Sequence, residues 1–179
     1  LIILTAISGI LESDGREGLR TDVTIVPTGG LEKVATFISL LRGSSLEIVC
    51  LLDSYTNEKG KAKMDKMIAD KIIQRSKVRF FDEFVKYNKA DLEDLFSKED
   101  YLKLFNSAFK EYSDIKITDL NSAIDKIILQ INEYISRERF NHFRPANEIA
   151  KVGADKSYFN KETLDNFGKV FKEVNGLFN

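Results

Sequence analysis

The feature that most constrains the fold is an unbroken apolar run, Ile48 to Leu52, which ends directly at Asp53. The run shows no polar alternation, which is typical of a strand covered on both faces in a parallel sheet. Asp53 then stands at the carboxyl end of that strand, where the loops of open α/β sheets form a ligand crevice. A carboxylate there is a candidate ligand for a hard cation. An aspartate that only starts a turn or caps a helix explains the residue equally well.

The segments on either side of this strand alternate between strand and helix patterns. We expect strands at 22–27, 46–52 and 78–81 and helices at 1–12, 31–41 and 61–74. This alternation predicts an α/β fold, with right-handed βαβ units and a parallel sheet flanked by helices. Because the chain starts inside a helical pattern and without methionine, we expect a fragment whose first strand, ahead of Leu1, is missing.

Beyond Phe81 the pattern changes and indicates helices without further strands. We expect these helices near 98–112, 118–137, 145–152 and 161–177. The sequence therefore predicts two packed parts. The first is an α/β part over residues 1–96, truncated at its N-terminus, and the second is a mostly α-helical C-terminal region over residues 97–179.

Composition and charge exclude several classes of function. Charged residues make up 31% of the chain but leave a net charge of -1, so no overall basic field indicates nucleic acid or an acidic membrane. The one cysteine, Cys50, lies inside the apolar run and is expected to be a reduced core residue. No apolar run approaches the ~20 residues of a membrane span, and Leu1-Ile2-Ile3-Leu4 lacks the basic start and cleavage site typical of a signal peptide. We therefore expect a cytoplasmic protein without a membrane partner.

Acidic residues also follow the third expected strand. Asp91, Glu93 and Asp94 lie within four positions of one another. Since the carboxyl ends of neighbouring parallel strands converge, acids from two loops can share divalent cations. The alternative is that these acids occupy the first turn of a helix and favour its dipole, an interpretation that suits Asp91 slightly better than Asp94.

Basic residues gather between 59 and 77. Of these, Lys59, Lys61 and Lys63 are candidates to contact a phosphate backbone near the crevice, although a solvated helix face is the simpler interpretation. Further along, Arg144 and Lys151 bound the segment RPANEIAK. They supply cations able to neutralise a phosphoryl transition state, or they are ordinary charges near helix ends.

Signals for nucleotide binding are weak. Thr28-Gly29-Gly30 offers backbone N–H groups at a helix start, yet glycines in such turns more often serve the backbone conformation. The chain has neither a GxxxxGK[ST] nor a GxGxxG motif, so ATP and dinucleotide binding are unsupported within it. The single histidine, His142, allows no histidine-rich metal site, and we expect a structural role for it.

The order of these motifs resembles a known family. The succession DVTIVPTGGLEKVATFISLL, EIVCLLDS, VRFFDEF and ADLEDLF is similar to the topoisomerase–primase (Toprim) domain of the OLD-family (overcoming lysogenization defect) ATP-dependent endonucleases. The resemblance implies a Toprim-like sheet in residues 1–96 and a helical tail that includes RFNHFRPANEIAK. It also implies a DNA endonuclease that hydrolyses phosphodiester bonds by a two-metal mechanism with Mg²⁺ or Mn²⁺, in anti-phage defence.

The resemblance assigns roles to particular residues. Asp53 matches the first acid of the family's DxD motif, and Glu93 and Asp94 match acids of a later motif. These three residues are therefore the expected metal ligands and catalytic acids. Lys151 is the expected assisting lysine, and the family's motif glutamate would fall just before Leu1.

Tyr55 stands where the family has the second DxD aspartate. A phenol is a poor ligand for Mg²⁺ because its ordinary pKa is about 10. A degenerate Toprim module that binds DNA or a protein partner without cleavage is therefore a second hypothesis, and a primase-like nucleotidyl transferase is a third. The resemblance further implies an ABC-type ATPase domain, which binds ATP, ahead of this region, and a homo-oligomeric assembly.

Overall fold

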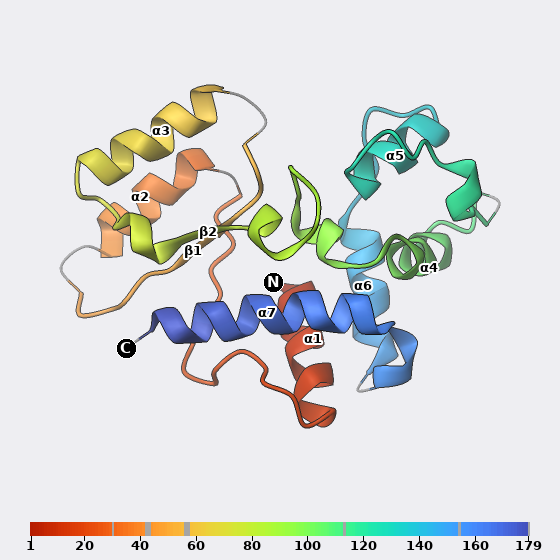
Figure 1. Ribbon diagram of the computed structural model, residues 1–179, viewed down its shortest axis with the longest axis horizontal. Coiled ribbons are helices and arrows are strands. Elements are labelled where there is room, and N and C mark those ends of the chain that lie inside the picture. The colour runs from red at the N-terminus through yellow and green to blue at the C-terminus, as the bar shows by residue number, and fades with distance from the viewer. Residues whose placement is uncertain (30, 42–43, 56–57, 113, 154, 179) are drawn as a thin grey trace.

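The computed structural model describes residues 1–29, 31–41, 44–55, 58–112, 114–153 and 155–178. Over these residues the chain is a mixed α/β protein with seven α-helices and a two-stranded parallel sheet. In Figure 1 the sheet lies on one side of the molecule with α2 (Leu31–Leu41) and α3 (Glu58–Ala69), and α4 (Lys98–Ala108), α5 (Ile127–Tyr134) and α6 (Phe143–Val152) lie on the other side. Below both groups run α1 (Ile2–Ser13) and α7 (Lys161–Leu177). The coarse expectation of an α/β part followed by helices is confirmed.

The helices and strands have the following bounds. The helices are α1 (Ile2–Ser13), α2 (Leu31–Leu41), α3 (Glu58–Ala69), α4 (Lys98–Ala108), α5 (Ile127–Tyr134), α6 (Phe143–Val152) and α7 (Lys161–Leu177). The strands are β1 (Cys50–Leu52) and β2 (Val78–Phe80), which pair in parallel with Cys50 opposite Val78. A short 3-10 helix, η3 (Leu92–Leu95), lies further along the chain than β2. It contains Glu93 and Asp94, and Asp91 directly precedes it.

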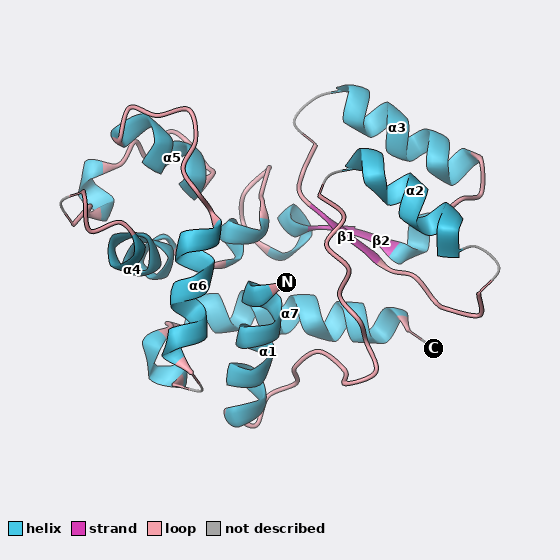
Figure 2. Ribbon diagram, turned by 180° about the vertical axis from the view of Figure 1, so that it is seen from behind, coloured by secondary structure: helices cyan, strands magenta, loops and turns pink. Residues whose placement is uncertain are grey.

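Two expected elements are wrong. Residues 22–27 form a loop and not a strand (Figure 2), because no strand within the described residues pairs with them. The long helix expected at 118–137 is reduced to a 3-10 turn and the short α5. Local bonds compete with the helix there: the Asn121 side chain accepts from the backbone N–H of Ala123, and Ser136 ends the segment at a φ of 53°.

Helix α3 also ends earlier than expected, at Ala69 and not at Gln74. Lys71 adopts a positive φ of 53°, the left-handed conformation that commonly follows a helix end. The expected glycine turn before α2 is described only in part: Gly29 has a φ of 69°, which favours glycine, and Gly30 lies outside the described residues.

Buried apolar side chains form two clusters. The smaller one fills the space between α2, α3 and the sheet, with Val34, Met64 and Val78 among its members. The larger one joins α1 to α4, α5, α6 and α7. Because α1 packs in the larger cluster, the packing connects residues 1–96 with residues 97–179 through that helix.

Cys50 is buried in the smaller cluster as a free thiol, and burial raises its pKa to about 11. A thiol with a raised pKa is a poor nucleophile at neutral pH, so the expected role as a core residue is confirmed.

Among the described helices, none combines the length and the apolar character that a membrane crossing requires.

Candidate functional site

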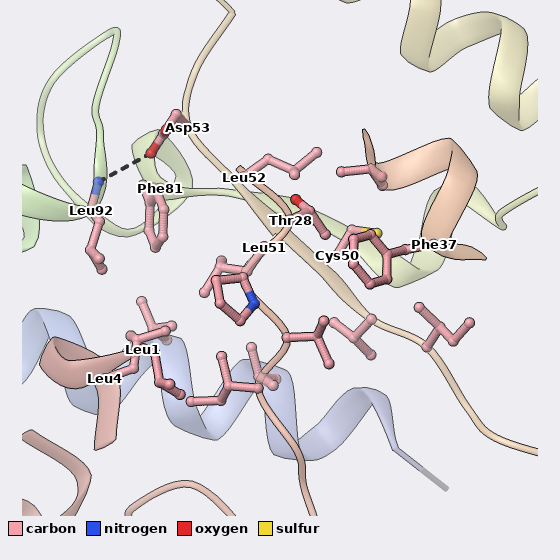
Figure 3. Close-up of a pocket in the computed structure, with 18 of the residues that line it drawn as sticks. Leu1, Leu4, Thr28, Phe37, Cys50, Leu51, Leu52, Asp53, Phe81 and Leu92 are labelled. Atoms are coloured by element: carbon pink, nitrogen blue, oxygen red, sulfur yellow. Dashed lines mark hydrogen bonds between the residues drawn. The ribbon is translucent and has the colours of Figure 1, made fainter. Parts of the chain in front are cut away.

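A cleft of about 1790 Å³ opens beside the carboxyl end of β1. Most of its wall is apolar and comes from β1, residues 22–28 and α7. Its polar end contains Asp53, Asp91, Glu93 and His142. In Figure 3, Asp53 points toward Leu92 at one end, away from the apolar side chains that line the rest of the cleft. The acids therefore occupy one end of a largely apolar cleft.

Direct hydrogen bonds tie the loop after β1 to the chain before η3. The backbone N–H of Ser54 donates to the carbonyl oxygen of Ala90 at 2.9 Å, and the N–H of Ala90 donates to Ser54 Oγ at 2.8 Å. The N–H of Leu92 donates to Asp53 Oδ1 at 3.3 Å. Because β1 and β2 are parallel, both connections leave the same edge of the sheet, and these bonds hold them together there.

Asp53 lies close to two other acids. The pKa of Asp53 is raised to about 6, mainly by burial and in addition by the negative charges of Asp91 and Glu93. The residue is still exposed on its outer side, so solvent screens part of this effect. A cation bound among these three carboxylates would relieve their repulsion. By electrostatics and donor chemistry, the cluster of Asp53, Asp91 and Glu93 suits a hard cation.

Asp94 faces the interior instead. It is 3% exposed, its Oδ2 accepts from the N–H of Asp91 and its Oδ1 accepts from the N–H of Ile127, both at 2.8 Å. Asp94 does not line the cleft, whereas Asp91 and Glu93 do. The Asp94 carboxylate therefore lies behind the cleft surface, where the charges of Asp91 and Glu93 still act on it, and its two bonds connect η3 to the start of α5.

Glu93 is held from the start of α6. Its Oε1 lies 3.3 Å from His142 Nδ1, and the His142 ring packs against Phe140 with a centroid separation of 4.8 Å. His142 Nε2 is buried and has no hydrogen-bond partner among the residues that the structure describes. The expected structural role of His142 thus takes a specific form, which is to fix the position of the Glu93 carboxylate.

Lys126 lies beside Asp91, and the sequence pattern did not predict this contact. Its Nζ is 2.6 Å from Asp91 Oδ1, the residue is 7% exposed, and its charge lowers the pKa of Asp53. Thirty-five positions separate Lys126 from Asp91, so only the folded chain shows the pair. The one local signal is a lysine directly before the apolar run of α5.

The expected assisting lysine lies elsewhere. Lys151 is near the far end of α6, about 13 Å along the helix axis from His142. Its side chain is 70% exposed and its Nζ lies 2.6 Å from Glu148. The structure therefore does not bring Lys151 to the acids.

The four expected DNA contacts differ in their settings. Lys59 and Lys63 of α3 line the cleft, and Lys61 is exposed on the same helix. Arg144 is already engaged: it pairs with Glu111 at 2.7 Å, and its guanidinium lies 3.9 Å above the Phe109 ring. The structure thus places Lys59 and Lys63, and not Arg144, at the cleft.

In their observed positions, these side chains do not form a complete metal-binding site. Within the described parts of the chain, no three His, Cys, Asp or Glu side chains converge closely enough to coordinate one ion. Tyr55 packs against Phe80 with a centroid separation of 4.8 Å and belongs to the smaller apolar cluster.

Comparison with known proteins adds no assignment, because no family model, no curated protein and no solved structure matches the chain.

Proposed function

We propose that this chain carries the cutting site of a metal-dependent DNA endonuclease of the OLD-like Toprim type. The observation that supports this proposal is the meeting of Asp53, from the carboxyl end of β1, with Asp91 and Glu93 at η3. Two connections from one edge of a parallel sheet supply these acids, which is the usual place for a ligand in such folds.

Each acid has a distinct part in the proposed reaction. Asp53 and Glu93 provide oxygen ligands for Mg²⁺ or Mn²⁺, and Asp91 lies beside them as a third. Asp94, with both oxygens on backbone N–H groups, holds η3 in place. When bound, the metal supplies a water of lowered pKa and stabilises the developing charge on phosphate. The water oxygen would bond to phosphorus and lose a proton, while the bond to the leaving oxygen would break and that oxygen would gain a proton.

The DNA backbone would follow α3 toward the acids. Lys59 and Lys63 border the same cleft as Asp53, so phosphates bound by them lie within reach of the acids. Arg139 also lines this cleft. The ABC-type ATPase domain with its ATP, the homo-oligomer and the Toprim topology belong to the same proposal and rest on the sequence resemblance.

Nicking of supercoiled plasmid by the purified protein with Mn²⁺ tests this function. Asp53→Asn removes a ligand charge with little change of volume, so we expect the nicking rate to fall at least about tenfold. Asp70→Asn, an exposed acid just after α3, serves as the matched control and should nick at the wild-type rate. Equal nicking by the Asp53→Asn variant and the wild type would remove Asp53 from the mechanism.

Binding without cleavage is the second candidate, and the position of Tyr55 favours it. This side chain packs on Phe80 in the smaller apolar cluster, so it offers no carboxylate where a second DxD acid is expected. Under this candidate the protein shifts DNA in a gel but leaves plasmid intact with either Mg²⁺ or Mn²⁺. Metal-dependent nicking that is lost with Asp53→Asn would exclude it.

A further inference from the structure

The apolar part of the cleft has no role in the proposed cutting reaction, which uses only the polar end. Four large apolar side chains that line the cleft are exposed: Leu1 at 56%, Val26 at 49%, Phe37 at 37% and Leu46 at 62%. Single exposed apolar side chains are ordinary, but several that share one concave surface indicate a site of interaction. The apolar part of the cleft therefore has the character of a binding surface.

Two segments that line the cleft have backbone groups without partners. Among the residues that the structure describes, none exchanges a backbone hydrogen bond with residues 24–27, and the same holds for Ser45, Leu46 and Ile48. Aliphatic and β-branched side chains, which suit a strand, are frequent in both segments. Because backbone N–H and C=O groups are obligatory hydrogen-bonding groups, water or another chain must satisfy them.

The sheet also has a free edge. β1 pairs with β2 along one edge, and no other strand within the described residues pairs with β1. Cys50, Leu51 and Leu52 of β1 line the cleft (Figure 3). A sheet of two strands is marginally stable, and an unpaired edge is a template for pairing with another chain. The cleft thus offers an added strand both main-chain hydrogen bonds and apolar walls.

The size of the cleft suits a strand better than a small ligand. Sites for small molecules usually have volumes of about 300–1,000 Å³, whereas this cleft has about 1790 Å³. One residue of a strand in a packed sheet fills roughly 160 Å³, because strands rise about 3.3 Å per residue, lie about 4.8 Å apart and pack in layers about 10 Å thick. The cleft therefore has room for a strand of up to roughly eleven residues.

The charges along these walls favour a neutral peptide over a nucleic acid. The charged residues within 22–28 and 45–49 are Asp22 and Glu47. Asp22 Oδ1 accepts from Arg20 Nε at 2.9 Å, and Glu47 Oε1 lies 3.3 Å from Lys77 Nζ. A nucleic-acid backbone would need unpaired positive charges along the same walls. An uncharged chain with apolar side chains meets no such requirement.

We propose that the apolar part of the cleft binds an extended peptide segment of a partner protein, which adds a strand to the free edge of β1. The peptide has apolar side chains at alternate positions, because alternate side chains of a strand face the same wall. Residues 24–27 and 45–48 of this chain already form the walls of the cleft, so they are not free to enter the cleft of a second copy. This inference goes beyond the proposed DNA cleavage and does not depend on it.

Fluorescence anisotropy with a labelled peptide of ten residues tests the inference. Valine and threonine alternate in this peptide, and a polyethylene glycol chain at one end keeps it in solution. The control peptide has the same side chains but carries N-methyl groups on the threonine nitrogens, which removes main-chain donors. Main-chain hydrogen bonds provide the affinity in strand addition, so the control should bind at least about tenfold more weakly.

Variants of the protein locate the binding surface. Leu46→Lys and Val26→Lys place a charge on the two walls, and each should weaken binding of the unmethylated peptide at least about tenfold. Both positions are exposed, so the fold should be retained. Leu129→Lys, at an exposed leucine of α5 that does not line the cleft, is the matched control and should bind as the wild type. Hydrogen–deuterium exchange of residues 45–52 should slow when the peptide is bound.

The other outcomes overturn the inference. These are absence of binding up to about 1 mM peptide, equal binding of both peptides, and binding that Leu46→Lys or Val26→Lys leaves unchanged. Dimers of the protein alone that Leu46→Lys abolishes would assign the cleft to a second copy. Displacement of the peptide by single-stranded DNA would assign it to a nucleic acid.

Discussion

Because Asp94 is buried, we predict how the free energy of unfolding depends on pH. Burial raises the pKa of this carboxyl from its ordinary 3.8 to about 6, against the effect of its two backbone hydrogen bonds. Between these two values the folded protein binds more protons than the unfolded chain. The contribution of Asp94 to the free energy of unfolding therefore rises as the pH falls from 7 toward 4, and it is lost again as the pH rises through about 6.

The size of this effect follows from the shift. About two pKa units correspond to about 3 kcal/mol, because each unit is worth about 1.4 kcal/mol. Little screening by solvent applies, since Asp94 is 3% exposed. Asp94→Asn is neutral at every pH and resembles the protonated acid in shape. The difference in unfolding free energy between the wild type and this variant should therefore change by about 3 kcal/mol between pH 7.5 and pH 4.

Urea denaturation followed by circular dichroism, at half-unit steps of pH in metal-free buffer, measures this difference. Subtracting the unfolding free energy of Asp94→Asn from that of the wild type removes the contributions of all other acids, provided that they titrate alike in both proteins. Asp70→Asn is the control, and its difference from the wild type should stay within about 0.5 kcal/mol across the range. A wild-type profile parallel to that of Asp94→Asn would mean that the Asp94 carboxylate faces solvent, and the internal role assigned to it would be wrong.

Three further predictions concern the site and its support. Ser54→Ala leaves the N–H of Ala90 without its acceptor, so we expect a loss of about 1–3 kcal/mol in urea denaturation together with weaker Mn²⁺ binding; unaltered binding would separate this loop from the site. Asp100→Ala removes the buried acceptor of Thr163 Oγ1 and of Lys103 Nζ, and should cost about 3–5 kcal/mol while any surviving folded protein binds Mn²⁺ normally. Replacing Lys59 and Lys63 by alanine together should lower DNA affinity and flatten its salt dependence by about two charges in fluorescence anisotropy, whereas two exposed lysines of α7, Lys169 and Lys172, should be replaceable without effect.

The sequence predicted the part of the fold that depends on local pattern. The last three residues of the apolar run before Asp53, Cys50–Leu52, form a strand, shorter than the expected 46–52; a second parallel strand pairs with it, and the segment beyond Phe81 is helical. Each of these results follows from composition within a short window. Residues 22–27 carried an equally good strand pattern, but a strand also needs a partner with a free edge, and no local pattern reports that.

Three acids of the site, Asp53, Asp91 and Glu93, were predictable from their positions after expected strands. Asp53 follows from its place after β1, whereas Ser54 and Lys126 act through partners that lie 36 and 35 positions away. Such contacts depend on how loops pack after folding. Lys151 is the opposite case. The sequence predicted it as a site residue, but α6 places it far from the acids.

The sequence itself explains why Asp91, and not Asp94, lines the cleft. Asp91-Leu92-Glu93-Asp94 has an acid at the residue before a helical turn and another three positions later, which is the spacing of a capping box. In that arrangement the later acid turns back to the N–H of the first residue, as Asp94 does toward Asp91. This bond occupies Asp94 Oδ2, and the N–H of Ile127 occupies Oδ1. Asp91 instead lines the cleft, where its Oδ1 pairs with Lys126. In similar turns we therefore expect the first acid, and not the last, to be available to a metal ion.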